Sequence, residues 1–207
     1  MHRTRIKFCG ITRQQDIQHA VSLGVDAVGL VFAESSPRVV NVQQACMLID
    51  HCGPFVTRVG LFMDQDASTI NNIIRQVPLD MLQFHGMESE HFCTSFGLPY
   101  LKSIAMGGSG DMTRFAEYPT AAALLLDSNE LGQPGGSGET FDWGEVPQLN
   151  RPIIVAGGLE ANNVGMAIKQ LTPYAVDVSS GIEAAKGEKD LTKMKTFVQS
   201  VRAADER

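Results

Sequence analysis

The stretch Arg5-Ile6-Lys7-Phe8-Cys9 decides how the rest of the chain is interpreted. Its apolar residues alternate with a lysine and a cysteine, and alternation with a period of two is the pattern of a β-strand. Ile6 and Phe8 therefore face one side of the strand, while Lys7 and Cys9 face the other. We expect the lysine and the thiol to point into whatever this strand helps to enclose.

A helix is expected to follow this strand at once. Thr12 is placed to cap its N-terminus with Gln15 as the capping-box partner, Ile17 begins its apolar side, and Gly24 ends it. A strand that leads directly into a helix is the unit of α/β folds, whose functional groups lie at the C-terminal ends of the strands. Cys9 occupies that position.

The same strand-and-helix unit recurs along the chain. Apolar or alternating runs predict further strands at residues 26–32, 56–62, 80–85, 99–104, 121–126, 152–156 and 174–179. Between the strands lie segments of helical periodicity, two of which are expected to be capped by Asn41 and Asp66. The repetition predicts an α/β fold of the single-domain (β/α)8 TIM-barrel type over residues 1–207.

An open, doubly wound sheet is the alternative fold. A nucleotide-binding sheet of that kind would carry a GxGxxG motif, with an acidic residue about 20 positions further on. The sequence contains no such pattern. The barrel is therefore the favoured prediction.

The composition limits the classes of partner. With 207 residues, 43% hydrophobic and 19% charged, the chain suits one compact domain. No apolar run reaches the roughly 18–20 residues of a membrane span, and no hydrophobic signal follows the N-terminus, so we expect a cytoplasmic protein without membrane contacts. The formal charge of −6 argues against nucleic acid but leaves room for a small anionic ligand where positive groups converge.

A metal centre is not expected. His85, His91 and Cys93 lie close together in the sequence, but their spacing matches neither HExxH nor a zinc ribbon. The cysteines also lack CxxC spacing and a secretion signal, so no disulfide framework is predicted.

The candidate functional residues lie at the C-terminal ends of the expected strands. Polar residues and glycines gather there, namely Cys9, Arg38, His85, Lys102, Asp127, Gly157, Gly158, Asp177, Ser179, Ser180 and Gly181. Gly157-Gly158 and Ser179-Ser180-Gly181 each stand just ahead of an expected helix, where backbone N–H groups and the helix dipole together make an anion site. Loops seven and eight are the usual phosphate position of such barrels, although the glycines alone are equally consistent with tight turns.

Cys9 and Asp127 end the first and the sixth expected strands, so they can face each other across the mouth of the barrel. A thiolate and a carboxylic acid in this arrangement form a base and acid pair for moving protons on a sugar. Lys7, on the same side of its strand as Cys9, is expected to lower the pKa of the thiol. On the residues alone, the alternative is that Cys9 is a small core residue and Asp127 a helix cap or a lysine partner.

Seven longer strings span nearly the whole chain. They are Lys7-Phe8-Cys9-Gly10-Ile11-Thr12, Asp26-Ala27-Val28-Gly29, Ser36-Pro37-Arg38, Gln83-Phe84-His85-Gly86, Gly136-Ser137-Gly138 with Phe141-Asp142-Trp143, Ala156-Gly157-Gly158-Leu159 and Asp177-Val178-Ser179-Ser180-Gly181. These strings resemble the phosphoribosylanthranilate isomerase family, in which they occur in the same order. The resemblance implies a single-domain barrel of tryptophan biosynthesis that uses no cofactor.

The resemblance also implies the chemistry. The family converts N-(5-phosphoribosyl)anthranilate to 1-(2-carboxyphenylamino)-1-deoxyribulose 5-phosphate by an Amadori rearrangement, the third committed step of L-tryptophan biosynthesis. By motif, Cys9 matches the general base, Asp127 the general acid, and Arg38 the arginine that binds the anthranilate carboxylate. His85 and Asp177 are expected to reach the sugar hydroxyls or to order the site.

The implied partner is this anthranilate-linked sugar phosphate alone, bound by a monomer or a homodimer. Lys7, Lys102 and Arg38 are expected to supply local positive charge for it in an otherwise acidic protein. The phosphate group is assigned to the glycine and serine loops: Gly157, Gly158, Ser179, Ser180 and Gly181.

Two other functions stay open at this point. One is a different sugar-phosphate barrel enzyme, either a pentose-phosphate epimerase, with metal-binding histidines and acids at several strand ends, or indole-glycerol-phosphate synthase, with more lysine and glutamate there. The other is a non-catalytic phosphate-binding regulator in which Cys9 senses redox state. Such a regulator would bind a substrate analogue without turnover.

Overall fold

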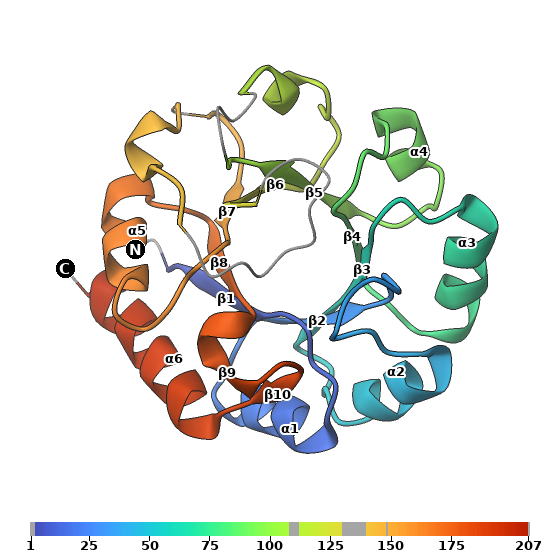
Figure 1. Cartoon of the computed structure of the whole chain (residues 1–207), viewed down its shortest axis with the longest axis horizontal. Coiled ribbons are helices and arrows are strands. Elements are labelled where there is room, and N and C mark those ends of the chain that lie inside the picture. The colour runs from blue at the N-terminus through green and yellow to red at the C-terminus, as the bar shows by residue number, and fades with distance from the viewer. Residues whose placement is uncertain (1–2, 108–111, 130–139, 148, 207) are drawn as a thin grey trace.

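The computed structural model describes residues 3–107, 112–129, 140–147 and 149–206. Parallel strands follow one another in chain order around a closed barrel, in which β1 pairs with both β2 and β8 (Figure 1). The barrel strands are β1 (Arg5–Phe8), β2 (Ala27–Val31), β3 (Thr57–Phe62), β4 (Met81–Phe84), β5 (Tyr100–Ala105), β6 (Ala123–Asp127), β7 (Ile153–Val155) and β8 (Ala175–Val178). This topology confirms the predicted (β/α)8 barrel.

Helices surround the barrel (Figure 1). They are α1 (Gln14–Ser22), α2 (Val42–Ile49), α3 (Ala67–Gln76), α4 (Glu90–Thr94), α5 (Val164–Leu171) and α6 (Leu191–Asp205), with short 3-10 helices η1 (Met112–Ala116), η2 (Trp143–Glu145) and η3 (Ser180–Ile182). A small antiparallel hairpin of β9 (Glu183–Ala185) and β10 (Glu188–Lys189) lies between η3 and α6. None of the helices in the described ranges is both long and apolar enough to cross a bilayer.

The starts of α2 and α3 lie where the sequence predicts them. The side chain of Asn41 accepts a hydrogen bond from the backbone N–H of Gln44, and the side chain of Gln44 accepts one from the N–H of Asn41. At α3, the Asp66 carboxylate accepts from the N–H of Thr69 at 3.0 Å. Both caps satisfy N–H groups that the first turn of a helix leaves without partners.

The predicted cap of α1 is wrong. Arg13, not Thr12, is the N-cap residue, and no side chain caps this helix, so Gln15 takes no part in a capping box. The Thr12 hydroxyl instead donates to the backbone carbonyl of Gly187, in the turn between β9 and β10. This contact spans 175 residues of sequence, which local spacing cannot reveal.

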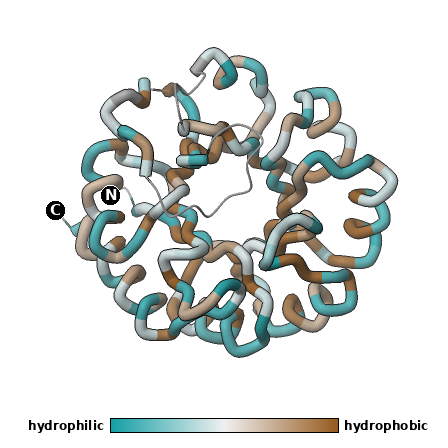
Figure 2. Tube along the Cα trace, in the orientation of Figure 1, coloured by the Kyte–Doolittle hydropathy of each residue, from teal (hydrophilic) through white to brown (hydrophobic). Residues whose placement is uncertain are grey.

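Alternation along the strands separates an outer core from the barrel interior. Outward-facing residues such as Phe8 and Phe62 are fully buried in the layer between the strands and the helices. Inward-facing residues such as Leu101 and Leu125 fill the interior, while Cys9 belongs to a separate small cluster at the C-terminal ends of β1 to β3. Figure 2 shows hydrophobic residues along the strands and more hydrophilic residues on the outer rim.

Candidate active site

A cavity opens at the C-terminal ends of the barrel strands and encloses about 740 Å³ of space, part of it continuous with solvent. Its wall contains most of the residues predicted from the sequence, namely Cys9, Arg38, His85, Asp127, Gly157, Gly158, Asp177, Ser179 and Ser180. Gly181 does not belong to the wall. A β-carbon on Gly181 would overlap the carbonyl oxygen of Leu159, so this glycine serves close backbone packing behind the loop.

Cys9 follows β1, and its thiol lies close to the ammonium group of Lys7. Asp177 stands directly opposite Lys7 in the β1–β8 pair, and Nζ of Lys7 donates to Oδ1 of Asp177 at 3.0 Å. Gly29 on β2 leaves the room for this group, because its β-carbon would lie 2.8 Å from Sγ of Cys9 and 3.1 Å from Nζ of Lys7. The thiol, the ammonium and the carboxylate are thus packed together inside the barrel.

Opposing effects set the pKa of the Cys9 thiol. Burial raises this pKa and the charge of Lys7 lowers it, and the net result is a pKa above the ordinary value. The predicted influence of Lys7 is therefore present, but burial outweighs it. Burial also lowers the pKa of Lys7, yet the charges of Asp177 and Cys9 outweigh that effect and raise it. Lys7 consequently remains a cation beside the thiol.

Asp127 lies buried at the C-terminal end of β6. Its Oδ1 accepts hydrogen bonds from the backbone N–H of Asn129 at 3.2 Å and from Nδ2 of Asn129 at 2.7 Å. Nε2 of His85 lies 3.8 Å from Oδ2. Burial raises the pKa of Asp127, against the lowering effects of His85 and Asn129. The carboxyl therefore keeps its proton to a higher pH than a free aspartate, as a proton donor requires.

Two buried polar atoms of cavity-lining side chains have no hydrogen-bond partner among the described residues, namely Oε1 of Gln83 and Nδ1 of His85. Leaving such atoms unpaired costs free energy, so they are available for polar groups of a ligand. A role is predicted from the sequence for His85 but not for Gln83, although Gln83 and His85 share one strand parity, which is the signal that identifies both.

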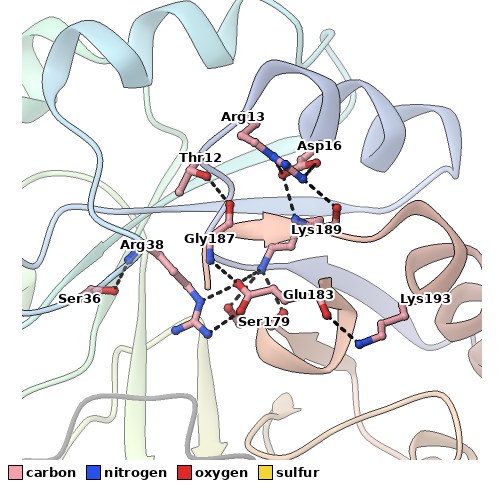
Figure 3. Close-up of polar contacts among 10 residues, drawn as sticks. All are labelled: Thr12, Arg13, Asp16, Ser36, Arg38, Ser179, Glu183, Gly187, Lys189 and Lys193. Carbon is pink, nitrogen blue, oxygen red and sulfur yellow. Dashed lines mark hydrogen bonds and ion pairs between the residues drawn. The ribbon is translucent and has the colours of Figure 1, made fainter. Parts of the chain in front are cut away.

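Arg38 is held by a residue that sequence reasoning missed. Its Nε donates to Oε1 of Glu183 at 2.7 Å and its Nη2 donates to Oε2 at 2.8 Å (Figure 3). Glu183 lies 145 positions further along the chain, so no local pattern connects the two residues. Because Arg38 also lines the cavity, its guanidinium combines a fixed position with access to a ligand.

The glycine and serine loops keep part of the predicted anion site. Within the described part of the chain, the backbone N–H groups of Gly158 and Ser180 donate no hydrogen bond, and both residues line the cavity. The helix after the first loop, α5, begins at Val164, so Gly157 and Gly158 do not stand just ahead of it as expected. The helix behind the second loop, η3, has three residues. These loops therefore offer backbone N–H groups rather than the dipole of a long helix.

Lys102 does not reach the cavity, contrary to the prediction. It is fully buried, and its Nζ donates to Oε2 of Glu88 at 2.8 Å and to the carbonyl of Gly86 at 2.6 Å. On β5 it shares the parity of Tyr100, which packs in the core outside the barrel. Lys102 therefore braces the loop after β4 and supplies no charge to a ligand.

Among the residues that the structure describes, no group of three or more His, Cys, Asp or Glu side chains is placed to hold a metal ion. The four cysteines are free thiols. Residues 136–138, and most of the loop predicted over residues 128–140, lie outside the described ranges.

The whole chain has relatives among known proteins. The family model described as "N-(5'phosphoribosyl)anthranilate (PRA) isomerase" matches residues 6–200. An N-(5'-phosphoribosyl)anthranilate isomerase of Nitrosococcus oceani is 47% identical over 201 residues, which cover 96% of this chain and 98% of that relative.

Solved structures give the same result. A phosphoribosyl anthranilate isomerase in complex with reduced 1-(o-carboxyphenylamino)-1-deoxyribulose 5-phosphate has a TM-score of 0.85 at 33% identity, with 97% of this chain and 99% of that chain covered. A structure of monomers of the dimeric enzyme from Thermotoga maritima has a TM-score of 0.84 at 31% identity, with 96% and 98% covered. The sequence match and the shared barrel together show that this chain belongs to the N-(5'-phosphoribosyl)anthranilate isomerase family.

Proposed function

We propose that this chain catalyses the Amadori rearrangement of N-(5-phosphoribosyl)anthranilate to 1-(2-carboxyphenylamino)-1-deoxyribulose 5-phosphate, the third committed step of L-tryptophan biosynthesis. The observation that carries the proposal is the joint presence of Cys9, Asp127 and Arg38 in the wall of one cavity. Membership of the family supports the same reaction. In this proposal residues 1–207 act as one catalytic domain.

Asp127 acts first, as the general acid. Its protonated carboxyl gives a proton to the furanose ring oxygen, the bond from that oxygen to C1′ breaks, and the lone pair of the anilino nitrogen forms an iminium. The pKa of Asp127, raised by burial, favours the protonated form. Because Asn129 donates twice to Oδ1, the proton is assigned to Oδ2.

Cys9 acts second, as the general base. Its thiolate takes the proton from C2′, and the electrons of that bond neutralise the iminium to give an enolamine, which tautomerises to the ketone. The cationic Lys7 favours the thiolate form of Cys9 against the effect of burial. Both steps are proton transfers on an activated sugar, so the proposed mechanism uses neither a metal nor another cofactor.

The polar ends of the substrate are assigned to separate groups of the cavity wall. Arg38 binds the anthranilate carboxylate through charge-assisted hydrogen bonds. The sugar hydroxyls are assigned to His85 and Asp177, with Gln83 added because its side-chain oxygen lacks a partner among the described residues. The phosphate is assigned to the backbone of the loop residues that line the cavity, Gly157, Gly158, Ser179 and Ser180, whereas Gly181 packs behind the loop.

We also propose that the protein works in the cytoplasm, as a monomer or a homodimer. The proposed step of amino-acid biosynthesis on a small sugar phosphate supports the location. Both assembly states remain in the proposal because the Thermotoga maritima relative is described as dimeric.

Turnover of freshly prepared phosphoribosylanthranilate, followed by the loss of its fluorescence, tests the proposal. Asp127→Asn and Cys9→Ala are each expected to reduce kcat by a factor on the order of 10²–10⁴, the usual contribution of a general acid or base. Cys46→Ala removes a thiol on α2 outside the cavity and is the matched control, which should keep wild-type activity.

Exchange at C2′ in deuterated water separates the two roles. Wild-type enzyme should place solvent deuterium at C2′ of the remaining substrate when the deuterated Cys9 thiol returns its hydrogen to the enolamine, and Cys9→Ala should not. Turnover by Cys9→Ala at the wild-type rate with wild-type deuterium incorporation would show that Cys9 is not the base. Binding of the reduced product analogue without any turnover by the wild-type protein would instead favour the regulator.

A further inference from the structure

We infer that Glu183 is a positioning residue for the carboxylate of the substrate: it holds Arg38 along one edge so that the end of the guanidinium faces the ligand. This inference rests on the proposed function and deepens it. The hydrogen bonds of Arg38, the packing around its stem and the charges of its neighbours each support it.

The geometry of an arginine allows two carboxylates at once. A guanidinium carries five N–H groups in one plane, and Glu183 uses the edge formed by Nε and Nη2, at 2.7 and 2.8 Å. The end of the group, formed by Nη1 and the second N–H of Nη2, remains for another bidentate partner. In Figure 3 the outer terminal nitrogen of Arg38 carries no contact to the residues drawn.

The stem of Arg38 is confined as well. A β-carbon on Gly10 would overlap Cδ of Arg38, so the arginine stem fills the space beside the backbone that follows Cys9. Gly10 has a φ of +70°, which favours glycine for a second reason. The backbone N–H of Arg38 also donates to Oγ of Ser36 at 3.1 Å. With the stem confined, the contact with Glu183 fixes the remaining rotation of the guanidinium.

Glu183 also joins Arg38 to the loop assigned to the phosphate. Its Oε1 accepts from Nζ of Lys189 at 2.9 Å, and the same Nζ donates to the carbonyl oxygen of Ser179 at 3.0 Å and to its Oγ at 3.3 Å. Figure 3 shows Glu183 between Arg38 and Lys189. One carboxylate therefore fixes the spacing between the groups assigned to the two anionic ends of the substrate.

The hairpin that carries Glu183 is itself anchored to the start of α1. The backbone N–H of Lys189 donates to Oδ2 of Asp16 at 3.1 Å, and Nη2 of Arg13 donates to the carbonyl of Lys189 at 2.9 Å (Figure 3). Asp16 is fully buried. These bonds fix the hairpin that carries Glu183 against α1, so the position of Glu183 does not depend on its contact with Arg38 alone.

The charges favour a carboxylate ligand. Burial raises the pKa of Glu183, but hydrogen bonds from Arg38 and Lys189 outweigh it and the pKa is lowered, so Glu183 is an anion. Arg38, which is always a cation, shares this single carboxylate with Lys189, whose pKa is lowered by burial. A second carboxylate at the end of Arg38 balances the remaining charge, whereas an uncharged aromatic ring does not.

Two ligands test the inference by calorimetric titration. One is reduced 1-(2-carboxyphenylamino)-1-deoxyribulose 5-phosphate, and the other is the anilino compound that lacks only the carboxylate. Glu183→Gln should weaken binding of the first ligand about 10- to 100-fold more than binding of the second, the range expected for loss of a charge-assisted hydrogen bond, because both ligands share the phosphate contacts and only the first uses Arg38. In an Arg38→Met background, Glu183→Gln should produce no further loss of preference for the carboxylate.

Glu188→Gln is the matched control, because Glu188 lies on the same hairpin, with its side chain 55% exposed and paired with Arg13 rather than Arg38. It should bind both ligands like wild type. Equal weakening of both ligands by Glu183→Gln, or an unchanged preference for the carboxylate, would overturn the inference. Where Glu183→Gln does not fold, Glu183→Asp, which is one methylene shorter, must show the same loss of preference or the inference is overturned. Wild-type protein without turnover of phosphoribosylanthranilate would overturn the proposed function instead.

Discussion

The thiol of Cys9 occupies the space left by the missing side chain of Gly29. A β-carbon at this position would lie 2.8 Å from Sγ of Cys9, closer than β-carbons approach other atoms, and 3.1 Å from Nζ of Lys7, which is an unusually tight contact. The absence of a side chain on β2 is therefore what allows the thiol and the ammonium group to lie together inside the barrel. Gly29 is part of the candidate site although it contributes no functional group.

Gly29→Ala should lower kcat/KM by at least about tenfold while the protein stays folded. The added methyl group displaces the Cys9 thiol and the end of Lys7, and it would also lie 3.2 Å from Cα of Cys9, so β1 must shift slightly. The thiol then leaves its position, and a general base contributes on the order of 10²–10⁴-fold. Gly165→Ala in α5 is the matched control, since its β-carbon would approach nothing nearer than Ala204, at 3.9 Å. Steady-state kinetics with a circular-dichroism melt checks both variants, and full activity of Gly29→Ala would contradict the assigned position of the thiol.

Inorganic phosphate should raise the melting temperature of the wild-type protein, because a ligand that binds only the folded state stabilises it. Gly158→Val should abolish this shift by filling the loop assigned to the phosphate. Valine at a positive φ is strained in any case, so Gly97→Val, at a φ of +69° and with nothing within 4 Å, is the control for strain alone. Thermal melts at matched ionic strength decide the matter. If phosphate still raises the melting temperature of Gly158→Val, the phosphate binds somewhere other than this loop.

Strand alternation and repetition of the strand-and-helix unit were sufficient to predict the barrel and most of its cavity wall. Lys7, Cys9 and Asp177 point inward because each lies on the inward parity of its strand, and the structure brings all three together. By the same alternation, Lys102 faces outward on β5, as Tyr100 does. The prediction that Lys102 supplies charge to a ligand was wrong because it considered only the position of Lys102 near the end of the strand and not the side of the strand that it faces.

Contacts between distant segments could not be predicted in this way. Glu183 binds Arg38 across 145 residues of sequence. Thr12 does not cap α1 and instead binds Gly187 across 175 residues. Both contacts involve the hairpin between η3 and α6, whose position depends on the closure of the barrel rather than on local propensity. Local patterns thus predict which residues face inward, whereas the partners of Arg38 depend on the tertiary fold.

Glu88→Gln should lower the free energy of unfolding by about 3 kcal/mol. Lys102 and Glu88 form a buried pair at 2.8 Å, and removing one charge leaves the other buried without compensation. Glu117→Gln, with a side chain 54% exposed and paired with Arg114, should change stability by less than about 0.5 kcal/mol. Urea denaturation measures both. Equal stability of Glu88→Gln and wild type would mean that the buried ammonium of Lys102 does not need its partner.

The pH dependence of kcat/KM follows from the two proposed roles. The active form carries a thiolate on Cys9 and a proton on Asp127 at the same time. As the pH rises, the fraction of enzyme in this form grows while Cys9 loses its proton and shrinks while Asp127 loses its own. Burial raises both pKa values, so both limbs of the profile lie at higher pH than the ordinary values of a thiol and a carboxyl group would give.

Asp127→Asn should remove the decline at high pH. Only the ionisation of Cys9 is then left, so the much reduced kcat/KM should rise with pH and level off without falling. Asp80→Asn is the matched control: Asp80 is half-exposed and pairs with Arg58 just before β4, away from the cavity, so its profile should keep both limbs. Initial rates from about pH 5 to about pH 10 with each protein provide the measurement. A decline that persists in Asp127→Asn with its wild-type midpoint would assign the acid to another group, and His85, 3.8 Å from the carboxyl, would be the first residue to replace.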